Sequence, residues 1–182
     1  IRVSNISLKR GALDFPWESD KPAGWDAFGI VIETSTDGQG PKIGERVLTW
    51  SFSGAWSQYR VVDRANVAIV PESISAAVAA ALPVAGLTAL RSLRSLHLQP
   101  GQSLAVTGAT GGVGHLLVQL AMHAGIKVSA VVHSQRGFDW LQASDVKPNE
   151  VLLAKEYPFE GTFDALVDTA GGDLLAHLLD NV

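Results

Sequence analysis

The sequence predicts a β-rich domain followed by an α/β domain with a doubly wound parallel sheet. Two observations carry this prediction. Up to about residue 70, short strand-like runs are separated by clusters of Gly, Pro, Asp and Ser. From Gln102 onward, strand patterns alternate with helix patterns, which is typical of parallel βαβ units.

Composition excludes several classes of partner. Of the 182 residues, 47% are hydrophobic and 18% are charged, a balance typical of a protein that buries a core. Lys and Arg number 14 against 18 Asp and Glu, and no basic run occurs, so we expect no nucleic-acid partner. The apolar runs are too short to span a bilayer, so we expect no membrane partner. The lack of cysteine excludes disulfides and thiolate ligands and fits a cytoplasmic location.

The first part of the chain is expected to hold five strands and a helical region. The strands are expected at residues 1–6, 28–34, 46–52, 56–62 and 67–70. Residues 75–96 are rich in Ala and Leu and indicate helix, interrupted at Pro83 and Gly86.

The second part predicts strands at residues 103–107, 127–132, 150–153 and 162–168, with helices at 112–124, 137–143 and 174–179. Both chain ends interrupt a strand or helix pattern. We therefore expect the sequence to be a piece of a longer protein.

A glycine-rich turn stands between the strand at 103–107 and the helix that follows it. Residues 107–114 read T-G-A-T-G-G-V-G. Behind them, an apolar stripe at helical spacing continues to Ala124, and Gly125 then ends the helix. Strand, glycine turn and helix in this order form the context of a dinucleotide-binding fingerprint, in which the backbone approaches the pyrophosphate. The alternative is a glycine turn without a ligand.

The end of the second strand bears on which dinucleotide would bind. An NAD site usually places Asp or Glu about 20 residues after the glycines, where it holds the ribose 2′-OH. Here that place is His133, followed by Ser134, Gln135 and Arg136. A hydroxyl and a guanidinium favour a 2′-phosphate, so NADPH is the expected cofactor. The alternative for Arg136 is a solvated residue at a helix start.

Several motifs together resemble one family. In order they are GWDAFGIV at 24–31, GERV at 44–47, GAWSQY at 54–59, LPVAGLTA at 82–89, GGVG at 111–114 with QLA at 119–121, and VDTAGG at 167–172. Their order and spacing resemble the medium-chain dehydrogenase/reductases, in the zinc-independent quinone oxidoreductase branch. The resemblance implies a GroES-like catalytic domain at 1–84 and a Rossmann NADP-binding domain at 85–182, each incomplete at its outer end.

The resemblance also implies a set of cofactor contacts. Thr88 would lie near the nicotinamide. The pyrophosphate would lie along Ala109, Thr110, Gly111, Gly112, Val113 and Gly114. The adenosine ribose would meet His133, Ser134 and Arg136, and Thr169, Ala170 and Gly171 would line the cofactor channel. This chain departs from the family at Lys9, where Asn is common near the nicotinamide, and at Ala154, where Tyr is common.

No metal site is expected. Trp25 stands where zinc-dependent relatives carry a His ligand, and no H-x-x-x-H spacing occurs. His115 and His123 are interpreted as surface or packing residues. Without a metal, hydride must go to an acceptor that already delocalises charge, such as a quinone or an α,β-unsaturated carbonyl. Lys9 and Tyr59 are proton-donor candidates by residue type alone, and for Tyr59 the favoured alternative is a packed strand residue.

The sequence thus predicts an NADPH-dependent quinone oxidoreductase or enone reductase whose partner is a small-molecule substrate, with a homodimer left open. One alternative is a non-catalytic NADPH-binding or structural protein on the same fold. Short-chain dehydrogenases are excluded, because they need a Y-x-x-x-K motif. Tyr59 and Tyr157 are followed four residues on by Asp63 and Gly161.

Overall fold

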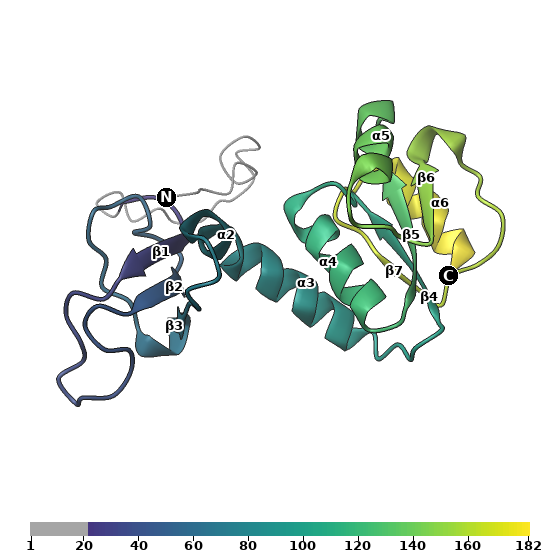
Figure 1. The fold of residues 1–182 in the computed structure, drawn as a ribbon. Helices are drawn as coiled ribbons and strands as arrows, with labels where there is room; N and C mark the ends of the chain where they lie inside the picture. The colour runs from purple at the N-terminus through teal and green to yellow at the C-terminus, as the bar shows by residue number, and fades with distance from the viewer. Residues whose placement is uncertain (1–21) are drawn as a thin grey trace. The chain divides into compact units, whose positions relative to one another are not determined.

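The structure, a computed structural model, describes residues 22–182. The described residues form two compact units that divide between Val84 and Ala85 (Figure 1). The strand expected at 1–6 and the candidate Lys9 lie outside the described residues.

The first unit contains a three-stranded antiparallel sheet in the order β1-β2-β3. Its strands are β1 (Asp26–Ile30), β2 (Arg46–Trp50) and β3 (Val67–Ile69). Val47 of the central strand lies opposite both Gly29 and Ile69 and is buried. Three of the expected strands are therefore confirmed; β2 and β3 end earlier than expected, and β1 both begins and ends earlier than the expected 28–34.

The strand expected at 56–62 is wrong. This segment consists of bends and irregular backbone, and a short 3-10 helix, η1 (Arg64–Asn66), follows it. The Arg60 guanidinium donates hydrogen bonds to the backbone oxygens of Trp25 and Ser53, both at 2.9 Å. The Arg60 side chain thus ties the segment to Trp25 and Ser53, while the backbone of 56–62 pairs with no strand among the described residues.

The helical region after β3 forms two helices, α2 (Ala76–Ala81) and α3 (Pro83–Ser95). Pro83 is the first residue of α3. Proline suits that position because a first-turn N–H has no partner within the helix. Gly86 lies inside α3 without ending it, so the interruption expected there is wrong, and the only break is the one before Pro83.

The second unit is built on a four-stranded sheet whose paired strands are all parallel, in the order β6-β5-β4-β7. The strands are β4 (Ser103–Thr107), β5 (Lys127–Val132), β6 (Glu150–Leu153) and β7 (Ala165–Val167). The helices between the strands are α4 (Gly112–His123), α5 (Gln135–Ala143) and the 3-10 helix η2 (Ala154–Glu156), and α6 (Asp173–Leu178) and η3 (Leu179–Asn181) follow β7. After β6 the chain returns to place β7 on the free side of β4. This reversal confirms the doubly wound sheet and makes the carboxyl ends of β4 and β7 its switch point.

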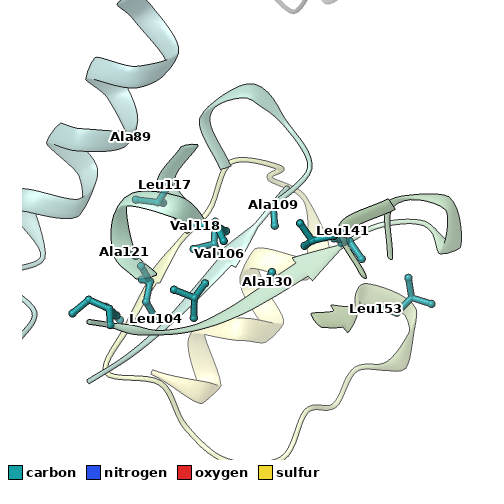
Figure 2. Close-up of a cluster of buried hydrophobic side chains, with 14 residues drawn as sticks. Ala89, Leu104, Val106, Ala109, Leu117, Val118, Ala121, Ala130, Leu141 and Leu153 are labelled. Atoms are coloured by element: carbon teal, nitrogen blue, oxygen red, sulfur yellow. The ribbon is translucent and has the colours of Figure 1, made fainter. Parts of the chain in front are cut away.

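The core of this unit holds α4 against the sheet. Figure 2 shows Leu117, Val118 and Ala121 of α4 beside Leu104 and Val106 of β4, and all five are fully buried. Burial of one such Leu or Val side chain contributes about 1.5–3 kcal/mol to stability. The stripe predicted from helical spacing therefore fixes the start of α4 at the end of β4.

Candidate cofactor site

The turn between β4 and α4 is tight and connected to the next strand. The Gly111 N–H donates to the Gly108 carbonyl oxygen at 2.8 Å, and Gly108 has a left-handed φ of 60°. Ala109 is buried, and its N–H donates to the Val131 carbonyl oxygen at 3.4 Å. The turn is thus held in place before any ligand arrives.

The glycines of this turn differ in how much space the protein leaves for a side chain. A Cβ at Gly114 would lie 2.3 Å from the Gly108 carbonyl oxygen, which no real structure tolerates. A Cβ at Gly111 would lie 3.1 Å from the same oxygen. A Cβ at Gly112 would meet only the Ala85 Cβ, at an ordinary 3.8 Å. Helix-on-turn packing therefore requires Gly114, whereas packing within the protein does not explain Gly112.

The first turn of α4 is suited to an anion. Gly111 is the residue before the helix, and it provides no side-chain hydrogen bond to the first-turn N–H groups. Gly112 is exposed, and Val113 is half-buried. Uncapped N–H groups and the positive end of the helix dipole are the features by which helices bind phosphate.

The residues after β5 lie at the start of α5 and are exposed. Ser134 is the N-cap residue of α5, and its hydroxyl oxygen accepts a hydrogen bond from the Gly137 N–H at 3.2 Å. The hydroxyl proton is left to donate elsewhere. His133 and Arg136 form no hydrogen bond or ion pair with another residue of the described chain. Both side chains face solvent at the carboxyl edge of the sheet.

Thr110, within the glycine turn, and Thr88, on α3, show which helices lie next to this turn. Thr110 is in van der Waals range of α5, because a Cβ at Gly137 would lie 3.5 Å from the Thr110 Cγ2. Thr88 is exposed on α3, one helical turn beyond Ala85, whose Cβ is near the Gly112 backbone. The structure thus gathers the starts of α4 and α5 at one edge of the unit, with α3 alongside.

The turn after β7 lies next to the glycine turn. Strands β4 and β7 are neighbours, and a Cβ at Gly108 would lie 2.5 Å from the Thr169 Oγ1. Ala170 is half-buried and Gly171 is exposed. The predicted residues that follow β4 and β7 are therefore brought together at the switch point.

Sequence reasoning missed two polar residues that join these turns. The Thr107 hydroxyl donates to an Asp168 carboxylate oxygen and accepts from the Thr169 N–H at 3.0 Å. Thr107 is completely buried. Two sequence features could have pointed to them. Thr107 is a polar residue at the end of an apolar strand, and Asp168 directly precedes the TAGG segment at 169–172.

The structure does not support a role for Tyr59 as a packed strand residue. Its side chain is 67% exposed and lies outside the three strands of the first unit. In the same unit, the rings of Trp25 and Phe52 are arranged edge to face at a centroid distance of 6.1 Å. Ala154, the other departure noted above, begins η2 after β6.

His115 is confirmed as a packing residue. Its ring lies edge-on to Trp140 of α5 at a centroid distance of 5.1 Å, and its buried Nδ1 has no hydrogen-bond partner. Burial lowers the pKa of His115 below its ordinary value. His123, eight residues further along α4, is exposed.

Two kinds of feature are missing from residues 22–182. They contain no group of three or more His, Cys, Asp or Glu side chains placed to hold a metal ion. Within the same range, no helix has the length and apolar character needed to cross a membrane.

A parallel sheet with a glycine turn at its switch point is the arrangement of the Rossmann class of dinucleotide-binding folds, and here a small β unit accompanies it. No protein-family model matches the sequence. Curated relatives include polyketide synthases. A phenolphthiocerol synthesis polyketide synthase of Mycobacterium marinum is 35% identical over 88% of this chain, and a pikromycin polyketide synthase component of Streptomyces venezuelae is 34% identical over 86%.

Solved structures agree with this fold. The quinone oxidoreductase of Coxiella burnetii covers 88% of the chain at 27% identity with a TM-score of 0.74, and that of Pseudomonas syringae covers 89% at 26% identity with a TM-score of 0.79. A mycobacterial protein solved with NADPH has a TM-score of 0.74 at 24% identity. The chain belongs to the medium-chain dehydrogenase/reductase superfamily, with a GroES-like β unit and a Rossmann unit, as its motifs predicted.

The chain is short beside these proteins. It spans 8% and 4% of the length of the two polyketide synthases. It covers 52% and 53% of the two quinone oxidoreductases.

Proposed function

We propose that this chain binds NADPH and serves a reductase that passes hydride to an α,β-unsaturated carbonyl or a quinone without a metal. The observation that carries the proposal is Gly112. Its missing side chain leaves room beside an uncapped helix start, and no packing within the protein explains that room. A phosphate group fits both features.

The residues present fit a dinucleotide. In this proposal the pyrophosphate lies along 109–114, where the α4 N–H groups meet it. Thr88 of α3 would lie toward the nicotinamide, and residues 169–171 would line the channel between the two. When bound, the nicotinamide supplies the hydride. The chain's own part is to orient the cofactor and to keep water away from it.

The start of α5 supports NADPH over NADH. No carboxylate stands among residues 133–136, where an NAD site would carry Asp or Glu, and the carboxylate of Asp139, one turn further along α5, accepts a hydrogen bond from the Gln135 side chain at 2.9 Å. Arg136 is exposed in the first turn of α5, and Ser134 keeps a hydroxyl proton to donate. Charge-assisted hydrogen bonds of this kind are worth about 1.5–3 kcal/mol each.

The acceptor is proposed from its chemistry and from the relatives. Hydride adds readily to a carbon conjugated with a carbonyl, because the negative charge moves to oxygen. Among the structural neighbours are proteins named quinone oxidoreductase and an enoyl reductase. The polyketide synthases among the sequence relatives favour the α,β-unsaturated carbonyl over the quinone.

Two experiments test the proposal: an assay of NADPH oxidation and a substitution of Gly112. The protein should oxidise NADPH in the presence of enones or quinones, and should do so after treatment with a chelator. Gly112→Val should weaken NADPH binding at least tenfold, or about 1.4 kcal/mol. Gly29→Val is the matched control, because a Cβ at Gly29 in β1 meets nothing within 4 Å.

Two outcomes separate the alternatives. NADPH binding without turnover of any acceptor would favour the non-catalytic alternative. Unchanged NADPH affinity in a folded Gly112→Val protein would contradict a phosphate at the glycine turn. Thermal unfolding without ligand shows whether each variant is folded.

A further inference from the structure

The turn after β7 has its backbone donors occupied by two side chains of the protein itself. The Thr169 N–H donates to the Thr107 hydroxyl at 3.0 Å. The Ala170 N–H donates to one Asp168 carboxylate oxygen at 3.4 Å, and the Gly171 N–H donates to the other at 2.8 Å. Three successive N–H groups are thus satisfied internally.

The same two side chains are joined to each other across 61 residues of sequence. Thr107 ends β4 and is completely buried, and its hydroxyl donates to Asp168 at the end of β7. A further bond runs from the Thr169 Oγ1 to the Thr107 carbonyl oxygen at 2.8 Å. The turn after β7 is therefore bound to the end of β4 through both side chains.

The two turns at the switch point differ in what they offer an anion. Residues 169–171 have no N–H group to spare and lie beside a carboxylate, which repels phosphate. The α4 start has N–H groups that no side chain caps. A phosphate at this edge of the sheet is thereby directed to α4 and away from the β7 turn.

Position matters as much as charge here. A Cβ added to Gly108 would lie only 2.5 Å from the Thr169 Oγ1, so the two turns leave no space for a side chain between them. A shift of the β7 turn toward β4 would close the space over the glycine turn, and a shift away would leave the cofactor without a wall. Small displacements of a binding residue have large effects on affinity and rate.

We propose that Thr107 and Asp168 are positioning residues of the cofactor site, which hold the β7 turn in place and withhold its N–H groups from phosphate. This inference rests on the proposed function. Neither side chain needs to touch the cofactor. Their effect passes through Thr169 and the two residues that follow it.

The test compares two substitutions of Thr107. Thr107→Val keeps the shape and removes the hydroxyl, whereas Thr107→Ser keeps the hydroxyl. NADPH affinity should fall at least tenfold in the Val variant and stay within twofold of the parent in the Ser variant. Asp168→Asn should also weaken NADPH at least tenfold, because the amide keeps only one of the two oxygens that accept from Thr107, Ala170 and Gly171.

A fragment of the cofactor separates positioning from general destabilisation. Adenosine 2′,5′-bisphosphate has the adenosine, the 2′-phosphate and one 5′-phosphate but lacks the second phosphate and the nicotinamide half, so in this proposal it does not extend to the β7 turn. Its affinity should change less than twofold in all three variants. Loss of fragment and NADPH binding together would show a merely structural role and overturn the inference.

Hydrogen exchange gives a second readout that needs no ligand. The N–H groups of residues 169–171 should exchange faster in Thr107→Val and regain protection in Thr107→Ser, while β5 stays protected in both. If Thr107→Val does not fold, Asp168→Asn carries the same comparison. A parent that binds no NADPH would overturn the proposed function and this inference with it. Normal parent binding with unaltered variants would overturn this inference alone.

Discussion

The α-carbon of Gly114 is so close to Gly108 that a Cβ added to it would lie 2.3 Å from the Gly108 carbonyl oxygen. Six residues apart in sequence, these two glycines let the first turn of α4 rest directly on the turn after β4. The same contact turns the N–H groups at the start of α4 toward the edge of the sheet where β5 and β7 also end.

Gly114→Ala is therefore expected to destabilise the protein, and Gly112→Ala is not. The added methyl at 114 forces the helix away from the turn, and overpacking of this kind costs about 1–3 kcal/mol. At 112 the methyl has room, and replacing a helical glycine gains up to about 1 kcal/mol. Thermal unfolding without ligand measures both. Equal stability of the two variants would contradict the packing argument.

Arg136→Ala is expected to weaken NADPH by about 1–3 kcal/mol and to leave NADH nearly unchanged. The reason is that only NADPH carries the 2′-phosphate that the guanidinium would meet. Arg94→Ala is the matched control, since Arg94 is an exposed arginine in the last turn of α3. Fluorescence titration with both cofactors gives the two affinities. Equal losses for NADPH and NADH would refute the assignment.

Stability is expected to depend on pH through His115. Burial lowers the pKa of this imidazole below the ordinary 6.5, so the folded protein favours the neutral ring. The unfolded chain then takes up the proton first, and the free energy of unfolding falls as pH drops below 6.5 toward the lowered folded pKa. Above that window the full contribution is present.

His115→Phe should remove this part of the pH dependence while it keeps the ring contact with Trp140. Urea unfolding at about pH 7.5 and about pH 5.5 measures the difference. The same substitution at the exposed His123 is the control. If both variants retain the parent's pH dependence, burial of His115 is not its source.

Activity is expected to be independent of zinc. Trp25 offers no metal ligand at the position where zinc-dependent members of the family carry His, and the sequence has no cysteine. Elemental analysis of the purified protein should find no stoichiometric zinc, and a chelator should leave NADPH oxidation unchanged. Activity lost to the chelator and restored by zinc would contradict this expectation.

The sequence determined those features that short stretches of chain decide. The stripe containing Leu117 and Ala121 predicted α4, and the apolar run before Thr107 predicted β4, because periodicity alone shows which faces are buried. The glycine turn was equally visible, since strand, turn and helix follow one another directly. The expected strand at 56–62 is wrong because no strand of the described residues pairs with this segment, and the pattern of one segment does not show whether a partner strand exists.

The tertiary structure decided everything that depends on distant residues meeting. Thr107 and Asp168 are 61 residues apart, and they come together only because β7 returns beside β4. Gly112 and Gly114 look alike in sequence, yet one is required by the backbone of Gly108 and the other has open room. The physical reason is the same in each case. A local pattern specifies backbone conformation and buried face, whereas distances across the switch point are set by how the strands are ordered in the sheet.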